Sequence, residues 1–386
     1  MVIFLKIVFW LSAFIIFWAN VGYPISIILL GKISKKRNKK ANDYEPTVTL
    51  MIVAHNEEKV INEKLENVLT VDYPKDKLEI LVSSDNSTDK TNEIVEEFIK
   101  THKSRNIRLF KVKERKGKTN AQNEAAKTVK SEILVMTDAN AMLKENAIKE
   151  LVSSFDKNVA YVSGKLVYSN SDDSLTSNTE NTYWDLDTKV REIESNVQTI
   201  TAGNGAIYAC KTSEYYAFDP IKCHDSAMPL FYALKGKRAI ANHNAIAYEK
   251  AGENDQDEFK RKVRMSRIVL SSILPSIKIL NIFKYKWFTY FYLGHRTSRY
   301  LLWLSHILLF VSNMFLMQKG YMYIITLVLQ VIIYILALMK KLFNINNKIF
   351  NFCSYYCLTI LAQMIGVIKT ITGQNKPFWE KAESTR

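Results

Sequence analysis

The chain has 386 residues, a formal net charge of +15 and a hydrophobic content of 48%. This length is enough for one large domain or two, and the four cysteines have neither the spacing of a metal site nor that of a disulfide-rich framework. The apolar residues are concentrated in blocks at both ends of the chain. Much of the positive charge lies beside these blocks, which favours a membrane protein over a nucleic-acid-binding protein.

The first apolar block, Ile7 to Leu30, is long enough to cross a bilayer. A cleaved signal peptide would carry its basic residues before the apolar core, whereas here the basic cluster follows it, at Lys35, Lys36, Arg37, Lys39 and Lys40. Positive charge marks the cytoplasmic side of a spanning helix. We therefore expect residues 1–40 to be an anchor with its N-terminus outside, followed by a cytoplasmic domain.

Strands and helices are expected to alternate from residue 47 onward. Short apolar runs predict strands at Thr47–Val53, Lys77–Ser83, Ile107–Val112 and within 132–140, and segments with helical spacing separate them. This alternation is typical of a Rossmann-like α/β domain with a parallel sheet. The chain has neither of the common glycine-rich phosphate-binding motifs after its first strand.

Polar and acidic residues instead follow three of these strands. Asn56 and Glu57 follow the first, Asp85 the second, and Asp138 and Asn140 the fourth. Ligands of open α/β sheets bind beyond the carboxyl ends of the strands. A carboxylate and a second oxygen there, Asp138 and Asn140, suit a divalent cation that holds a diphosphate. The alternative for this pair is an Asx turn that has no ligand.

Four segments in this order resemble the membrane-bound family 2 glycosyltransferases, which have a GT-A fold and include hyaluronan, chitin and cellulose synthase-like enzymes. The segments are Ala54-His55-Asn56-Glu57-Glu58, Ser84-Asp85-Asn86-Ser87-Thr88-Asp89, Lys116-Gly117-Lys118 and Thr137-Asp138-Ala139-Asn140. The resemblance covers roughly residues 46–270. It implies an inverting glycosyltransferase that uses a nucleotide-diphosphate sugar, expected to be UDP-linked, together with Mg²⁺ or Mn²⁺.

The same resemblance suggests roles for these residues. His55, Asn56, Glu57, Asp85 and Lys118 would hold the donor nucleotide, and Asp138 would reach the diphosphate and the metal. Asn140 departs from the family, because relatives usually have a second Asp there. A neutral amide still supplies an oxygen ligand, but it lowers the negative charge of the site.

An acceptor side is expected after residue 158. Val159–Tyr168 and Thr199–Tyr208 read as strands of a smaller sheet, and Ala239–Tyr248 as another strand. Gly203 and Asn204 belong to a Gly-Asn-Gly segment that allows close approach of a ligand to the backbone, although a plain bulge explains it equally well.

Asp225 precedes a segment with helical character, Ser226 to Leu234. By resemblance, a carboxylate at this place is the catalytic base. The alternative reading is a helix N-cap, and both can hold together, because a capping carboxylate keeps its second oxygen free.

Residues 261–265 correspond to the Gln-x-x-Arg-Trp segment of processive relatives. Arg261 replaces the Gln, Arg264 matches the Arg, and Met265 replaces the Trp on which the acceptor sugar would stack. A guanidinium suits the leaving diphosphate, whereas a basic helix face on anionic lipid is the alternative. Without the Trp we expect transfer of one or a few sugars. A processive polysaccharide synthase and an inactive scaffold remain alternatives.

Further apolar segments complete the chain. Ile268–Ile282 looks interfacial, Tyr300–Met317 and Tyr321–Met339 look like a hairpin of spanning helices, and Phe350–Ile371 fits either a spanning or an interfacial helix. We expect a multi-pass protein of the cell (inner or plasma) membrane that acts on a membrane lipid or lipid-linked glycan and binds no nucleic acid. The expected divisions are 1–40, 44–265, 266–295, 296–375 and a tail, 376–386.

Overall fold

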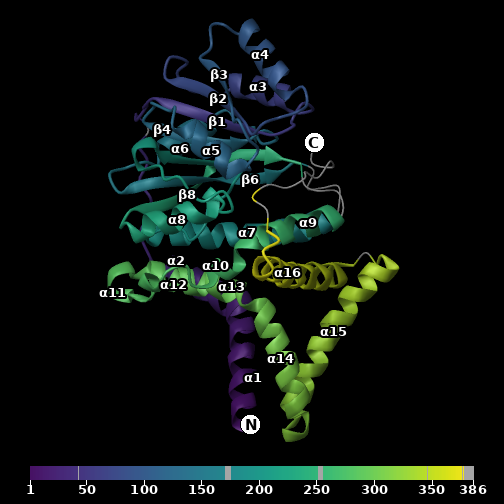
Figure 1. The fold of residues 1–386 in the computed structure, drawn as a ribbon. Coiled ribbons are helices and arrows are strands. Elements are labelled where there is room, and N and C mark those ends of the chain that lie inside the picture. Colours follow the sequence, from purple (N-terminus) through teal and green to yellow (C-terminus); the bar gives the residue numbers. More distant parts are fainter. Residues whose placement is uncertain (42, 170–174, 251–254, 346, 376, 378–386) are drawn as a thin grey trace.

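The computed structural model describes residues 1–41, 43–169, 175–250, 255–345, 347–375 and 377. Figure 1 shows an α/β domain at one end of the molecule, long helices at the other end, and a layer of short helices between them. Of the expected tail, 376–386, all but Pro377 lies outside the described residues.

The α/β domain is built on one eight-stranded sheet with the strand order β3-β2-β1-β4-β7-β6-β8-β5. The strands are β1 Val48–Ala54, β2 Leu78–Ser84, β3 Ile107–Lys111, β4 Ile133–Asp138, β5 Met142–Leu143, β6 Val159–Tyr168, β7 Ile207–Lys211 and β8 Arg238–Glu249. β1 pairs in parallel with β2 and with β4, and β2 pairs in parallel with β3. The expected Rossmann-like parallel half is therefore confirmed.

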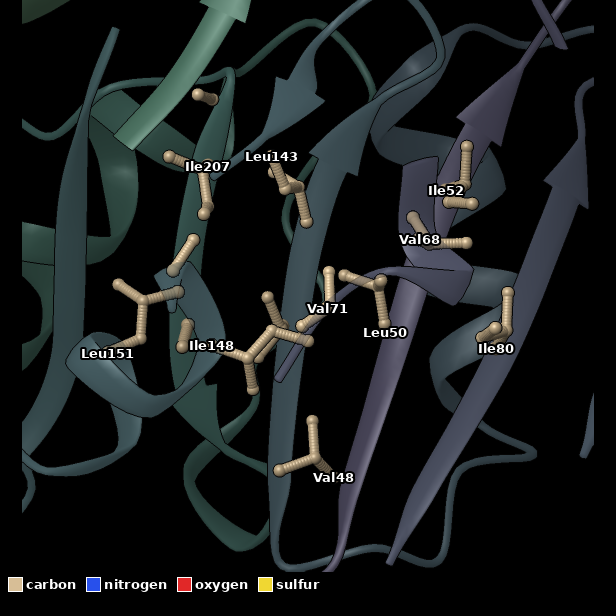
Figure 2. Packing of buried hydrophobic residues seen from close by; sticks show 14 of the residues in the cluster. Val48, Leu50, Ile52, Val68, Val71, Ile80, Leu143, Ile148, Leu151 and Ile207 are labelled. Carbon is tan, nitrogen blue, oxygen red and sulfur yellow. The ribbon is translucent and has the colours of Figure 1, made fainter. Parts of the chain in front are cut away.

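Residues of β1 are buried along its whole length because helices cover both faces of the sheet. Figure 2 shows Val48, Leu50 and Ile52 of β1 on one face, with Val68 of α3 (Ile61–Leu69) and Ile148 of α6 (Ala147–Val152) in the same cluster. Met51 and Val53, which alternate with them along β1, belong to a second buried cluster on the opposite face. A fully buried central strand explains why this stretch reads as a continuous apolar run.

The predicted strand Thr199–Tyr208 is wrong for most of its length, because β7 begins only at Ile207. Asn204 interrupts the extended backbone: its amide donates to Ser163 Oγ, and its own side chain accepts from the amide of Ala206. A separate acceptor-side sheet was also a wrong expectation. β7 pairs antiparallel with β4 and so joins β6 and β8 to the same sheet.

A 23-residue helix, α7 (Leu175–Val197), was not predicted from the sequence. Val190 and Val197 on this helix are buried against Tyr23, Ile27 and Phe291, which belong to helices at the membrane end of the molecule. α7 therefore joins the sheet domain to those helices (Figure 1). The other helical segments of the domain are α4 Thr91–Thr101, α5 Lys118–Ala126, η2 Thr212–Glu214, α8 His224–Leu234 and α9 Asp255–Met265.

Three helical stretches among the described residues are long and apolar enough to cross a membrane: Val2–Ile33, Tyr321–Phe343 and Lys348–Ile371. The first consists of α1 Val2–Phe17, η1 Trp18–Gly22 and α2 Tyr23–Ile33, and the others are α15 and α16. The predicted first helix of the hairpin, Tyr300–Met317, needs a correction. Its counterpart, Leu302–Lys319 (α14 Leu302–Leu316 with η6 Met317–Lys319), qualifies only together with Trp287–Tyr300, from which it is bent by 59°.

Short helices form the layer between the sheet domain and the long helices (Figure 1). They are η3 Ser266–Ile268, α10 Val269–Ile273, η4 Ile277–Leu280, α11 Ile282–Tyr285, α12 Trp287–Phe291, η5 Tyr292–Thr297 and α13 Ser298–Tyr300. Ile277 and Phe283 of this layer are 70% and 89% exposed, as suits a surface that rests on lipid. α16 runs across the direction of α1 and lies below α9, which favours an interfacial helix over a third crossing.

Candidate functional site

The carboxyl ends of β1 and β2 form one polar corner. His55 Nδ1 lies 2.8 Å from the carbonyl oxygen of Asp85. Asn56 and Asn86 both have positive φ angles of 54°, and the side-chain oxygen of Asn56 accepts from the amide of Thr88 at 2.7 Å. Asparagine tolerates this left-handed conformation better than most residues. These contacts fix the two strand ends next to each other.

Asp85 is buried, and its carboxylate is bound by main-chain amides. Its two oxygens accept from the amides of Lys116 at 3.2 Å and Gly117 at 2.9 Å. Gly117 has a φ angle of 95°, which glycine adopts without strain. Asp85 therefore holds the loop that starts α5. Glu57 is also buried, and its amide donates to Thr91 Oγ1 at the start of α4.

Lys118, the first residue of α5, connects the two sides of the site. Its Nζ donates to Asp138 Oδ1 at the end of β4 and, at 3.3 Å, to the carbonyl oxygen of Gly205. Burial alone would lower the pKa of Lys118, but the carboxylates of Asp138, Asp225 and Glu249 together outweigh burial and raise it. A charged ammonium group thus occupies the place beside Asp138 where a positively charged ligand would bind.

Asp138 and Asn140 flank the turn after β4, and both are half-buried. Within the described part of the chain, no group of three or more His, Cys, Asp or Glu side chains could hold a metal ion. The oxygen atoms of Asp138 and Asn140 nevertheless suit one kind of metal ion, Mg²⁺. Mg²⁺ is commonly bound by one or two protein carboxylates together with substrate phosphates, and Asp138 offers such a carboxylate, already paired with a cation.

Asp225 lies in the first turn of α8, where Cys223 is the N-cap residue. The reading of Asp225 as the N-cap is therefore wrong. A Cβ atom on Gly205 would lie 3.6 Å from Asp225 Oδ2 and 3.8 Å from Lys118 Nζ. The absence of a side chain at Gly205 thus leaves the space between Asp225 and Lys118 open. The amide of Gly203 donates to the main-chain oxygen of Asp225 at 2.7 Å.

His224, next to Asp225, is a buried neutral imidazole. Burial, reinforced by the charge of Lys118, lowers its pKa to about 3. Its two ring nitrogens lie 3.3 Å from the hydroxyl of Tyr208 and 3.5 Å from that of Tyr215. This side chain points into the core and leaves Asp225 as the acidic group that faces the site.

Three arginines, Arg261, Arg264 and Arg267, follow one another at helical spacing in α9 and η3, beside the candidate site. Arg261 makes a two-pronged ion pair with Glu258, at 2.7 and 3.0 Å. Arg267 donates to the Cys223 sulfur at 3.3 Å. Burial first, and then the like charges of Arg261 and Arg267, lower the pKa of Arg264 to about 10. Arg264 and Arg267 therefore place positive charge close to Cys223, at the start of α8.

Two residues next to the site were not predicted from the sequence. Lys64 of α3 is fully buried, and its Nζ donates to the carbonyl oxygen of Ala141, just after β4. Arg191 of α7 donates to the carbonyl oxygen of Gly203 at 2.7 Å. Lys64 could have been noticed in the sequence, because a lysine on the buried face of an amphipathic helix is unusual. Arg191 could not, because other charged residues surround it in the sequence and none of them stands out.

Comparison with protein families identifies the sheet domain. Residues 49–212 match the model of the family described as Glycosyl transferase family 2. The match contains the strand-end residues at Asn56, Asp85 and Asp138 and stops before Asp225 and α9. The polar edge described above is therefore the part of the site that lies inside the family domain.

Curated relatives are similar over part of the chain. A dolichyl N-acetyl-alpha-D-glucosaminyl phosphate 3-beta-D-2,3-diacetamido-2,3-dideoxy-beta-D-glucuronosyltransferase of Methanococcus voltae is 32% identical over 110 residues, 28% of this chain and 34% of its own length. A beta-monoglucosyldiacylglycerol synthase of Nostoc is 28% identical over 156 residues, 40% of this chain and 33% of its own. A poly-beta-1,6-N-acetyl-D-glucosamine synthase of Staphylococcus epidermidis is 30% identical over 111 residues, 29% of this chain and 26% of its own. The similarity thus spans about a third or less of these relatives.

A solved structure matches the fold over nearly the whole chain. The mannosyltransferase PcManGT of Pyrobaculum calidifontis, solved in complex with GDP-Man and Mn²⁺, superposes with a TM-score of 0.76 and 20% sequence identity. The superposition covers 96% of this chain and 100% of that one. The shared fold includes the sheet and the helices at both ends of the chain. Residues 49–212 of this chain therefore form a family 2 glycosyltransferase domain, and the chain has the GT-A fold.

Proposed function

We propose that the protein transfers a sugar from a nucleotide-diphosphate sugar to an acceptor in the membrane, with inversion at the anomeric carbon. One observation carries the proposal: the carboxylates of Asp138 and Asp225 lie on the two sides of the space left open by Gly205, with Lys118 between them. In this proposal the Asp138 carboxylate serves the donor and the Asp225 carboxylate serves the acceptor. This is the arrangement that a single displacement requires.

The donor would lie along the carboxyl edge of β1, β2 and β4. His55, Asn56, Glu57 and Asp85 surround the corner where the nucleoside would bind, and Lys118 offers positive charge to the diphosphate. A UDP-linked donor remains our expectation, while the superposed mannosyltransferase was solved with GDP-Man. Both nucleotides therefore belong in the donor panel.

In the reaction, the acceptor hydroxyl attacks the anomeric carbon as the bond from that carbon to the diphosphate oxygen breaks. Asp225 would accept the proton of the hydroxyl as a general base. Negative charge then grows on the leaving diphosphate, next to Lys118 and Arg264, whose positive charges stabilise it. The acceptor oxygen enters on the face opposite the leaving group, and the configuration inverts without a covalent intermediate.

A divalent cation, Mg²⁺ or Mn²⁺, fits this site as a partner of the diphosphate. Asp138 would hold it, with Asn140 as the second protein ligand, and the phosphate oxygens would complete its coordination. When bound, such an ion neutralises charge on the diphosphate. Since Lys118 already pairs with Asp138, nucleotide and metal are expected to bind together, with the diphosphate drawing Lys118 away.

The acceptor would be a lipid or a lipid-linked glycan, and the product would carry one or a few added sugars. Met265, at the position of the expected stacking Trp, is 49% exposed and offers no flat face to a sugar ring. Gly203, Asn204 and Arg261 lie on this side, with Arg261 held by Glu258. Multi-pass insertion in the cell membrane with a cytoplasmic catalytic domain is part of the proposal and agrees with the basic cluster after Leu30.

Asp225→Asn tests the proposal. Membranes containing the full-length protein are incubated with a panel of labelled UDP- and GDP-sugars, and the product is sized. Loss of a general base costs about 10²–10⁴ in rate, so the variant should lose transfer while it binds UDP or GDP as the wild type does. Turnover above a few per cent of wild type would remove Asp225 from the reaction.

A further inference from the structure

A cluster of buried charged side chains lies between the sheet domain and the helices of the membrane end. Asp187 and Glu194, both on α7, are almost completely buried. His295 of η5 lies between them, with Nδ1 2.8 Å from Glu194 Oε1 and Nε2 3.0 Å from Asp187 Oδ1. Buried charges are tolerated in proteins when they are paired. This cluster therefore fixes α7 against η5.

Two more side chains extend the cluster toward the membrane helices. The hydroxyl of Tyr23, in α2, donates to Glu194 Oε1 at 2.5 Å, and Arg299 of α13 donates to Asp187 Oδ1 at 2.6 Å. Burial alone would raise the pKa of Asp187, but the guanidinium groups of Arg191 and Arg299 hold it well below its usual range. Asp187 is therefore a permanent negative charge to which arginines are anchored.

Arg191 connects this cluster to the candidate active site. Its Nε lies 2.6 Å from Asp187 Oδ2, and its Nη1 donates to the carbonyl oxygens of Gly203 at 2.7 Å and Ala202 at 3.3 Å. The amide of Gly203 in turn donates to the main-chain oxygen of Asp225. A single residue, Gly203, thus separates the guanidinium of Arg191 from the backbone of Asp225, the candidate base.

The other side of Gly203 is closely packed. A Cβ atom there would overlap the hydroxyl of Tyr161, which is fully buried on β6. Gly203 is therefore held between Tyr161 and Arg191. Without the Arg191 guanidinium, the carbonyl oxygens of Ala202 and Gly203 would lose this hydrogen-bond donor.

We propose that Arg191 is a positioning residue, which keeps Asp225 at its reaction distance through Gly203 and is itself fixed by Asp187 in the ionic cluster at the membrane side. The inference rests on the proposed role of Asp225 as base. A displacement of about 1 Å in a reacting group can cost roughly 10²-fold in rate. Binding of the donor nucleotide does not use this contact and should be spared.

Arg238 provides a matched control. It also binds main-chain oxygens near the end of α7, donating to Gln198 at 2.6 Å and Ser195 at 2.7 Å, and both of these partners lie outside the 202–205 loop. Arg191→Met, Arg191→Lys and Arg238→Met are compared with wild type as full-length proteins in lipid nanodiscs. Arg191→Lys retains a positive charge beside Asp187 and is therefore the control for simple misfolding.

The first measurement is amide hydrogen exchange, which needs no substrate. Arg191→Met should speed exchange at the Gly203 amide at least tenfold, Arg191→Lys should restore part of the protection, and Arg238→Met should leave that amide as in wild type. Unchanged exchange at Gly203 in Arg191→Met would overturn the inference.

The second measurement is turnover with the donor found in the nucleotide-sugar panel. In Arg191→Met, kcat should fall about ten- to a hundredfold, while KM for the donor stays within twofold of the wild-type value. Arg191→Lys should have a kcat between those of Arg191→Met and wild type. An equal loss in Arg238→Met, or a loss confined to donor KM, would also overturn the inference. Asp225→Asn is assayed in parallel. If it stays active, the base assignment itself fails; if it is inactive while Arg191→Met is fully active, only the positioning role fails.

Discussion

At the scale of single residues, the charge balance at Asp138 would determine how the edge of the sheet receives the proposed diphosphate. Lys118 pairs with Asp138 and lies next to the place where the donor phosphates would enter. The strand-end position of Asp138 could be predicted from the sequence, because a buried apolar run ends there. Its pairing with Lys118 could not, because the fold brings β4 and α5 together across 20 residues of sequence.

Lys118→Met should weaken binding of UDP or GDP in the presence of Mn²⁺ by tenfold or more. The variant loses a charge-assisted contact to phosphate, and a tenfold loss corresponds to about 1.4 kcal/mol. Calorimetric titration measures this effect. Lys116→Met is the control, because Lys116 lies in the same loop but is exposed and pairs with Glu114. Equal losses in both variants would mean that only the net charge of the loop matters.

Lys64 should give the protein a pH-dependent stability. Burial lowers its pKa from 10.5 to about 7 in the folded state. Between these two values the unfolded chain binds the proton and the folded chain does not, so the free energy of unfolding contributed by this group rises with pH. Melting temperatures of wild type and Lys64→Met should therefore differ in slope between pH 7 and 9, with wild type rising more steeply. Parallel slopes would contradict the lowered pKa.

At the scale of secondary-structure elements, α7 connects the sheet domain to the helices at the other end of the molecule. Its apolar positions Val190, Ile193 and Val197 follow helical spacing, so its existence was predictable. A strand was instead expected from Thr199, eight residues before β7 begins at Ile207. Local propensity favoured a strand from Thr199. The conformation of this segment is instead fixed by the hydrogen bonds of Asn204 and by the contacts of Arg191 with the carbonyl oxygens of residues 202 and 203. These contacts depend on elements that are distant in the sequence.

The contact between α2 and α7 should show strong coupling between two residues. A Cβ atom on Gly31 would lie 2.8 Å from Ile193 Cδ1 and 2.9 Å from its Cγ1. Gly31→Ala should therefore destabilise the protein by about 1–3 kcal/mol through overpacking, and Ile193→Ala should relieve that strain. Thermal unfolding of both single variants and the double variant tests this. Additive effects would show that the cost of Gly31→Ala does not arise from its contact with Ile193.

At the scale of the whole molecule, the helices of the membrane end supply partners for charges inside the catalytic domain. Tyr23, His295 and Arg299 all lie outside residues 44–265, yet they bind Glu194 and Asp187 within that range. The GT-A fold and apolar end segments were evident from sequence motifs and hydropathy. This interlocking was not, because each partner pair is separated by more than 100 residues.

A fragment containing residues 44–265 should therefore bind nucleotide but turn over poorly. The strand-end residues that face the donor remain, whereas Asp187 and Glu194 lose their partners from the membrane end, which is costly for buried charges. We expect UDP or GDP affinity within a fewfold of the full-length protein and kcat at least tenfold lower. Titration and a transfer assay on the same preparations measure both. A fragment with full turnover would show that the membrane helices only anchor the domain.

The order of the strands also bears on self-association. The two edges of the sheet are β3, with five residues, and β5, with two. On β3, Arg108 and Lys111 form ion pairs with Glu79 and Glu96, so charged side chains flank the exposed backbone groups. Short, charged edges resist strand-to-strand aggregation. Copies crowded together on a two-dimensional membrane surface would thus not join their sheets edge to edge.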